Sequence, residues 1–177
     1  MPFFEKLSSA GFNVLAYDYR GYGTSEGTPS EINSYEDIET AYNYLVNEQK
    51  IAPEKIIIHG RSLGGAISID LASRQKCGGL IVESSFVSAF RVMTGISLYP
   101  FDKFESINKM GKVKSPVLFI HGTNDTLIPF WHGQKLFEAA NEPKTFYAVE
   151  NAGHNDLHEI AGKKYFEEIK RFSATVK

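Results

Sequence analysis

The chain has 177 residues, with 19 lysines and arginines against 21 aspartates and glutamates, so its formal charge is 19 − 21 = −2. A nearly neutral chain has no basic field to gather nucleic-acid phosphates, which argues against a nucleic-acid partner. Its hydrophobic fraction of 42% and charged fraction of 23% are those of an ordinary globular protein, which excludes disorder and coiled coil and favours one domain. The single cysteine, Cys77, cannot form an internal disulfide, a cysteine metal cage or a CxxC redox pair, which favours a reducing compartment.

No apolar run is long enough to cross a bilayer, and residues 1–11 show no signal peptide pattern of a basic stretch followed by an apolar one. Taking Met1 as the natural start, we expect a cytoplasmic protein without a transmembrane segment.

Five short apolar runs, rich in β-branched residues, predict β-strands. They lie at residues 13–17, 55–58, 80–82, 117–120 and 145–149. Strands buried on both faces read as continuous apolar runs, whereas exposed antiparallel strands alternate more cleanly. Helical periodicity separates the runs, so the sequence predicts one α/β domain over residues 1–177: a three-layer sandwich of a mostly parallel sheet with helices on both faces.

The predicted helices follow the strands in chain order. Apolar residues at helical spacing over 38–46, preceded by Ser34 and Asp37 as an N-terminal cap, predict the first helix. Further helices are predicted around residues 66–72, 136–140 and 165–172. Residues 84–112, which are less regular and rich in aromatic side chains, form either a small lid or a plain connecting helix with a packed turn.

A G-x-S-x-G motif, Gly60-Arg61-Ser62-Leu63-Gly64, follows the second predicted strand and precedes a small-residue helix. Its glycines predict a tight turn in which strand and helix approach closely and the serine hydroxyl is held above the sheet. The N-terminus of the helix adds a positive potential, and the Leu63 N–H is placed to bind an oxyanion. The alternative role for Ser62 is an ordinary N-terminal helix cap.

A serine hydroxyl needs a histidine base and an acid that orients this base. Asp125 follows the fourth predicted strand and His154 follows the fifth. The carboxyl ends of parallel strands lie at one edge of the sheet, so the loops that carry Ser62, Asp125 and His154 can meet there.

Other acidic residues compete for the orienting role. Glu83 ends the third predicted strand and is the alternative acid, while Asp156 lies too near His154 to orient it and is interpreted as a loop brace. We favour Asp125 because turn-forming residues around it can aim a carboxylate inward.

The remaining histidines are interpreted as structural. His59 is expected to be packed and hydrogen-bonded within its strand, and His121 to brace the loop that presents Asp125. His132 and His158 are expected at the surface. His154 and His158 have the spacing of a helical zinc pair, but Asn155 stands where the catalytic glutamate would be, so we expect no metal.

The order serine, acid, histidine resembles that of the α/β-hydrolases, and the similarity extends from Phe12 to the C-terminus. Tyr17–Ser25 resembles the loop after the fourth strand of that family, and Gly60–Gly65 resembles its small-lid branch. The resemblance implies Ser62 as nucleophile, His154 as general base, Asp125 as orienting acid and no cofactor.

The chain departs from complete α/β-hydrolases because three strands that precede residue 12 in that family are not found. The third of these strands normally lies between the fourth and the fifth, and its loop supplies the second oxyanion donor. We therefore expect the chain to be truncated at its N-terminus, with two alternatives: the sheet closes by pairing residues 13–17 with 55–58, or the chain is non-functional.

These observations predict a serine hydrolase that cleaves the carboxylester or thioester of a small acyl substrate through an acyl-enzyme. The alternatives are amide hydrolysis by a serine peptidase, which has the same triad chemistry, and a non-catalytic hydrolase-like interaction domain. The sequence specifies neither the substrate nor the oligomeric state.

Overall fold

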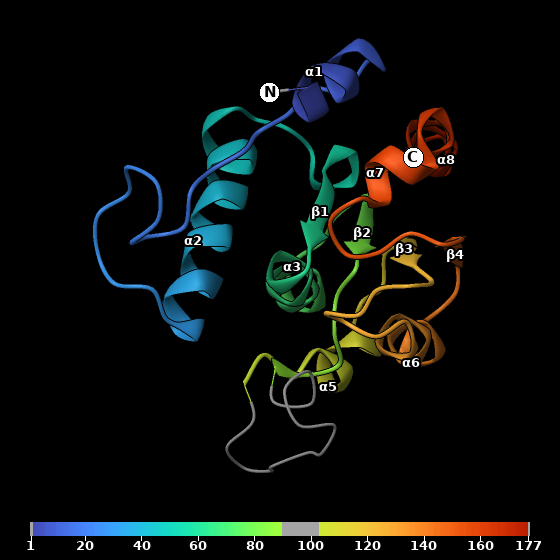
Figure 1. Ribbon diagram of the computed structural model, residues 1–177. Helices are drawn as coiled ribbons and strands as arrows, with labels where there is room; N and C mark the ends of the chain where they lie inside the picture. The colour runs from blue at the N-terminus through green and yellow to red at the C-terminus, as the bar shows by residue number, and fades with distance from the viewer. Residues whose placement is uncertain (1, 90–102, 177) are drawn as a thin grey trace.

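The computed structural model describes residues 2–89 and 103–176 as helices, strands and connections (Figure 1). The helices are α1 Pro2–Ser9, α2 Glu31–Asn43, α3 Leu63–Arg74, α5 Ser106–Met110, α6 Trp131–Ala139, α7 Leu157–Ala161 and α8 Lys163–Ser173, with short π and 3₁₀ turns at Tyr44–Glu48 and Pro53–Lys55. The strands are β1 Ile57–Arg61, β2 Gly79–Glu83, β3 Val117–Gly122 and β4 Lys144–Val149. Among these described helices, none combines the length and the apolar character needed to cross a membrane.

The four strands form one parallel sheet in the order β1-β2-β3-β4. Their register aligns His59 with Ile81, Ile81 with Leu118, and Leu118 with Thr145. Four of the five predicted strands are thereby confirmed, with bounds that differ by up to three residues.

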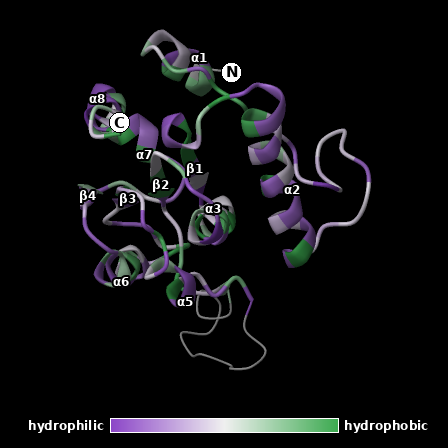
Figure 2. Ribbon diagram, turned by 180° about the vertical axis from the view of Figure 1, so that it is seen from behind, coloured by the Kyte–Doolittle hydropathy of each residue, from purple (hydrophilic) through white to green (hydrophobic). Residues whose placement is uncertain are grey.

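Alternate residues of the central strands feed two separate cores, as the strand period of two requires. Leu80 of β2 and Phe119 of β3 pack against α2, α3 and α6. Ile81 and Leu118 face the opposite way, toward α1, α7 and α8. The helices carry both hydrophilic and hydrophobic residues, as amphipathic covering helices must (Figure 2). The predicted three-layer α/β architecture is therefore confirmed.

The predicted strand at residues 13–17 is wrong, because this segment contains no strand. Its apolar side chains Val14 and Leu15 are 42% and 44% exposed. The segment runs beside α2 instead of joining the sheet (Figure 1). Three residues after it, the Arg20 Nε–H donates to the Asp37 carboxylate of α2 at 2.7 Å. A β-strand requires a neighbour for its backbone groups, and within the described residues β1 pairs with β2 alone. The alternative in which residues 13–17 pair with residues 55–58 is excluded for the same reason.

The N-terminal cap of α2 is Ser30, not Ser34 as the sequence pattern indicated. The side chain of Ser30 accepts a hydrogen bond from the Asn33 N–H at 3.1 Å, and α2 begins at Glu31. Ser34 lies one turn inside the helix, where its hydroxyl donates to the Ser30 carbonyl at 2.8 Å. Helix α8 matches its predicted range most closely, and α3 and α6 also lie at the predicted places.

Residues 84–112 connect β2 to β3 and contain the short helix α5. The central part of the predicted lid, residues 90–102, lies outside the described residues. The Phe104 N–H donates to the Glu31 carboxylate at 2.8 Å. This bond attaches the part of the connection just before α5 to the first residue of α2.

Candidate active site

Ser62 lies between β1 and α3 with a backbone φ of 55° and ψ of −121°. This left-handed conformation is unfavourable for a residue that carries a side chain. The Ser62 N–H donates to the Glu83 carbonyl at 2.8 Å, and the Ser85 hydroxyl donates to the Ser62 carbonyl at 2.9 Å. The Ser62 side chain makes no capping hydrogen bond to α3, so its alternative role as a helix cap is contradicted.

Two glycines permit this turn. A Cβ atom on Gly60 would lie 2.2 Å from the Gly64 carbonyl oxygen, and one on Gly65 would lie 2.5 Å from the Ser85 Cβ. The nearest contact of a Cβ on Gly64 is an ordinary 3.7 Å to the Tyr19 hydroxyl. The second close approach that we expected at Gly64 therefore occurs one residue later, at Gly65.

Leu63 is the first residue of α3, so its N–H has no carbonyl one turn earlier in the helix to bind. Its side chain is 39% exposed. The amide therefore lies at the positive end of a 12-residue helix, directly after Ser62.

Asp125 and His154 are brought together by the loops after β3 and β4. The Nδ1 atom of His154 lies 2.7 Å from Oδ2 of Asp125. The other carboxylate oxygen accepts the N–H groups of Leu127 at 3.0 Å and Ile128 at 2.7 Å. Asp125 is buried, and its own loop amides fix the plane of its carboxylate.

The same two loops are also joined through their backbones. The Asn124 N–H donates to the Ala152 carbonyl at 2.9 Å, and the Asn151 N–H donates to the Thr123 hydroxyl at 2.9 Å. Because Asn124 precedes Asp125 and Ala152 is two residues before His154, these bonds fix the spacing of the acid and the histidine.

Arg61 connects the serine turn to the histidine loop. Its guanidinium donates to the backbone carbonyl of His154 and, at 3.1 Å, to the side-chain oxygen of Asn155. Ser62 follows Arg61 directly, so the turn and the loop lie side by side. This contact was not predicted, and its one signal in the sequence is the position of Arg61 within the motif.

Glu83, the alternative acid, binds other groups than His154. Its buried carboxylate lies 3.2 Å from His59, 3.0 Å from His158 and 3.3 Å from Arg61. It also accepts the Tyr165 hydroxyl at 2.6 Å. Burial alone would raise the pKa of Glu83, but hydrogen bonds from the two histidines and their charges hold it well below its usual range.

His59 and His121 behave as predicted. His59 is hydrogen-bonded within β1 to Glu83, and Nε2 of His121 binds the Ile128 carbonyl at 2.9 Å in the loop that carries Asp125. Because a carbonyl oxygen only accepts, Nε2 of His121 is the donor in this bond, and burial lowers the pKa of the ring.

The surface position predicted for His132 is wrong, whereas His158 keeps 34% of its side chain exposed and contacts a buried carboxylate with its ring. His132 is fully buried because it lies one helical turn before the core residue Leu136, on the inner side of α6. His158 faces Glu83, and Phe3 of α1 stacks on its ring with centroids 4.7 Å apart. The polar environment of a buried carboxylate thus draws His158 inward.

Asp156 braces its loop, as predicted, by accepting the Gly153 N–H at 2.6 Å. His154 and His158 bind two different carboxylates, so they do not form a zinc pair. The described part of the chain holds no group of three or more histidine, cysteine, aspartate or glutamate residues that could bind a metal.

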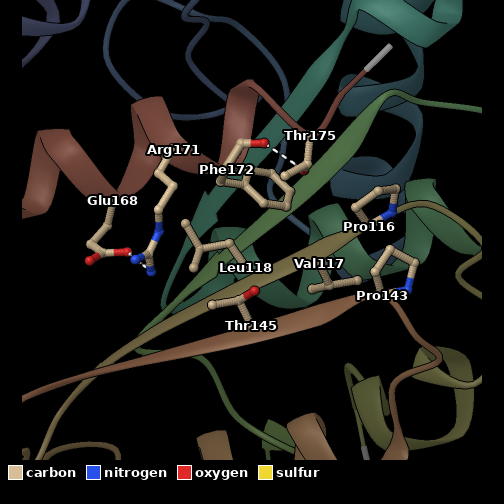
Figure 3. A pocket seen from close by; sticks show the side chains of 9 residues that line it. All are labelled: Pro116, Val117, Leu118, Pro143, Thr145, Glu168, Arg171, Phe172 and Thr175. Carbon is tan, nitrogen blue, oxygen red and sulfur yellow. Dashed lines mark hydrogen bonds and ion pairs between the residues drawn. The ribbon is translucent and has the colours of Figure 1, made fainter.

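A small cavity of about 100 Å³ lies at the other end of the sheet (Figure 3). Val117 and Thr145, at the starts of β3 and β4, line it together with Phe172 of α8. Ser62, Asp125 and His154 all follow the carboxyl ends of their strands, so this cavity is separate from the candidate site.

The parallel sheet with two helical layers and a strained serine turn after β1 define an α/β-hydrolase. The family model described as serine aminopeptidase, S33, matches residues 1–104, which is more than half of the 177 residues. The chain therefore belongs to this family of the α/β-hydrolase superfamily.

Relatives and solved structures agree with this assignment. Alpha/beta hydrolase domain-containing protein 17C of Xenopus tropicalis is 44% identical over 162 residues, which cover 90% of this chain and 52% of that protein. Protein 17B of Homo sapiens is 45% identical over 162 residues, covering 90% and 56%. The chain thus spans about half the length of these relatives.

The solved structures support the fold. An esterase of Pyrococcus furiosus superposes with a TM-score of 0.82 at 21% identity, covering 97% of this chain and 74% of that one. A monoacylglycerol lipase of Paleococcus ferrophilus gives a TM-score of 0.76 at 20% identity, covering 98% and 88%.

Proposed function

We propose that the chain is a serine hydrolase that cleaves a carboxylester or thioester with Ser62, His154 and Asp125. The observation that carries this proposal is the 2.7 Å contact between His154 Nδ1 and the buried Asp125. This bond keeps the Nδ1 proton on the ring, so Nε2 is the nitrogen left to act as a base.

The proposed reaction has two steps. Ser62 Oγ attacks the acyl carbonyl as its proton passes to His154 Nε2, and the Leu63 N–H donates to the developing oxyanion. His154 then protonates the departing alcohol or thiol. In the second step water gives a proton to His154 and attacks the acyl-enzyme, which releases the carboxylate and returns the proton to Ser62.

Amide hydrolysis is the second candidate, because the matching family is described as serine aminopeptidase. The names of the similar structures, an esterase and a monoacylglycerol lipase, favour ester cleavage. The same triad chemistry serves both reactions, so the acyl pocket decides between them.

The test is labelling of the purified chain with a fluorophosphonate, which reacts with activated serines. We expect labelling of the chain as given and none of Ser62→Ala, and p-nitrophenyl ester and thioester hydrolysis faster than aminoacyl-anilide cleavage. An unlabelled, folded chain would instead support the interaction-domain alternative, and faster anilide cleavage would support a peptidase.

A further inference from the structure

Arg61 contacts three groups that belong to two parts of the fold, the end of β2 and the histidine loop after β4. Its Nε lies 3.3 Å from the Glu83 carboxylate at the end of β2, and its terminal nitrogen donates to the His154 carbonyl and the Asn155 side chain. We propose that Arg61, anchored by Glu83, is a positioning residue that holds the His154 backbone at a fixed place beside Ser62. This inference rests on the proposed function.

The anchor is itself rigid. The Glu83 carboxylate is only 1% exposed, and it is also held by Tyr165 and His158 on the opposite helical layer. A guanidinium presents its N–H groups in a planar fork, so one side can bind this carboxylate while the other binds the loop oxygens. An ammonium group, a single point of charge, cannot span both with the same geometry.

The backbone bonds of Asn124 and Asn151 hold the start of the histidine loop, and Arg61 adds an attachment at His154 itself. Asp125 holds the His154 ring at Nδ1, and Gly153 and Asn155 flank it on an exposed loop. Rotation of the loop about the Asp125 contact would move Nε2 away from Ser62 without breaking that bond. A displacement of about 1 Å between reacting groups can cost roughly 100-fold in rate, so a fixed backbone carbonyl at His154 matters for the chemistry.

The test measures fluorophosphonate labelling of the purified chain at several probe concentrations. This separates the maximal rate constant, the half-saturating concentration and the final fraction labelled. The variants are Arg61→Met and Arg61→Lys. The matched control is Arg74→Met, because Arg74 is 41% exposed, like Arg61 at 39%, and pairs with the buried Asp70 at 2.8 Å on α3.

We expect Arg61→Met to reach the same final fraction with a maximal rate constant roughly 10- to 100-fold lower and an unchanged half-saturating concentration. Arg61→Lys should recover only part of the rate, and Arg74→Met should label like the parent chain. A purely structural role of Arg61 would instead lower the fraction labelled and leave the rate constant of the folded molecules unchanged.

Two outcomes would overturn the inference alone: an unaltered rate constant in Arg61→Met, or an equal loss in Arg74→Met. Absence of labelling in the parent chain would overturn the proposed function as well, so the two failures are distinguishable. The thermal melting of each variant is measured together with its final fraction labelled. The melting curve identifies any variant that has lost its fold.

Discussion

Two buried carboxylates at the same edge of the sheet are held in opposite ways. Asp125 is oriented by two amides of its own loop, and its remaining oxygen is hydrogen-bonded to His154 at 2.7 Å, with His121 Nε2 farther away at 3.6 Å. Glu83 is surrounded by four side chains from β1, α7 and α8. A carboxylate held by the amides of its own loop, such as Asp125, can orient a histidine. A carboxylate bound by several side chains, such as Glu83, instead joins the elements that carry them.

The largest effect that would test this comparison is that of Asp125→Asn on activity. Asparagine can still accept the loop amides, but it cannot hold His154 in the tautomer that leaves Nε2 as a base. We expect the labelling rate to fall by about 10³ to 10⁴ with little change in stability. Retention of most of the rate would contradict the assignment of Asp125 as the orienting acid.

Glu83→Gln should show the converse pattern. Removal of the charge leaves the Arg61 guanidinium without its buried counter-charge, so the free energy of unfolding should fall by about 3 kcal/mol. Urea unfolding measures this loss, and labelling of the folded fraction should fall far less than in Asp125→Asn. If the two variants affected rate and stability alike, the distinction between the two carboxylates would fail.

Lowering the pH should weaken the same contacts of Glu83 and with them the stability of the fold. Because the pKa of Glu83 in the folded chain lies below its ordinary value of 4.5, its charged form stabilises the fold above about pH 4.5. This contribution is lost as the pH falls from there through the lower folded-state pKa. The stability gap between the parent chain and Glu83→Gln should therefore narrow below about pH 4.5, as urea unfolding at neutral and acidic pH would show; a constant gap would exclude this linkage.

The smallest effect concerns the hydroxyl of Tyr165. Tyr165→Phe removes a donor to the charged Glu83 and should cost about 2 kcal/mol, because hydrogen bonds to charged groups are stronger than neutral ones. Tyr42→Phe is the matched control: Tyr42 donates at 2.7 Å to the neutral Lys76 carbonyl, and its loss should cost about 1 kcal/mol. Equal losses in thermal and urea unfolding would show that the charge of Glu83 adds nothing to this bond.

The sequence was most informative where local pattern and tertiary contact agree. The apolar runs at β2 and β3 are buried on both faces, so their composition alone identifies them, and the loop after β3 carries Asp125. Residues 13–17 show a similar pattern but have no neighbouring strand, and strand formation depends on that neighbour. The contact between His158 and Glu83 was not predicted, because an imidazole at a helix start gives no sign of the carboxylate that it will face.

The contact between Arg61 and His154 could not be predicted at all, since the two residues are 93 positions apart. Topology indicates that the loops meet, but not which side chain bridges them. By contrast, the order of Ser62, Asp125 and His154 with their strands was sufficient to predict that one edge of the sheet would gather them.

The positive φ of Ser62 has a further consequence for how this molecule responds to mutation. Glycine adopts that conformation without strain, so Ser62→Gly should raise the melting temperature while removing the hydroxyl. A library selected for thermal stability alone would therefore enrich chains without the serine, whereas a library selected for stability and labelling together would retain Ser62.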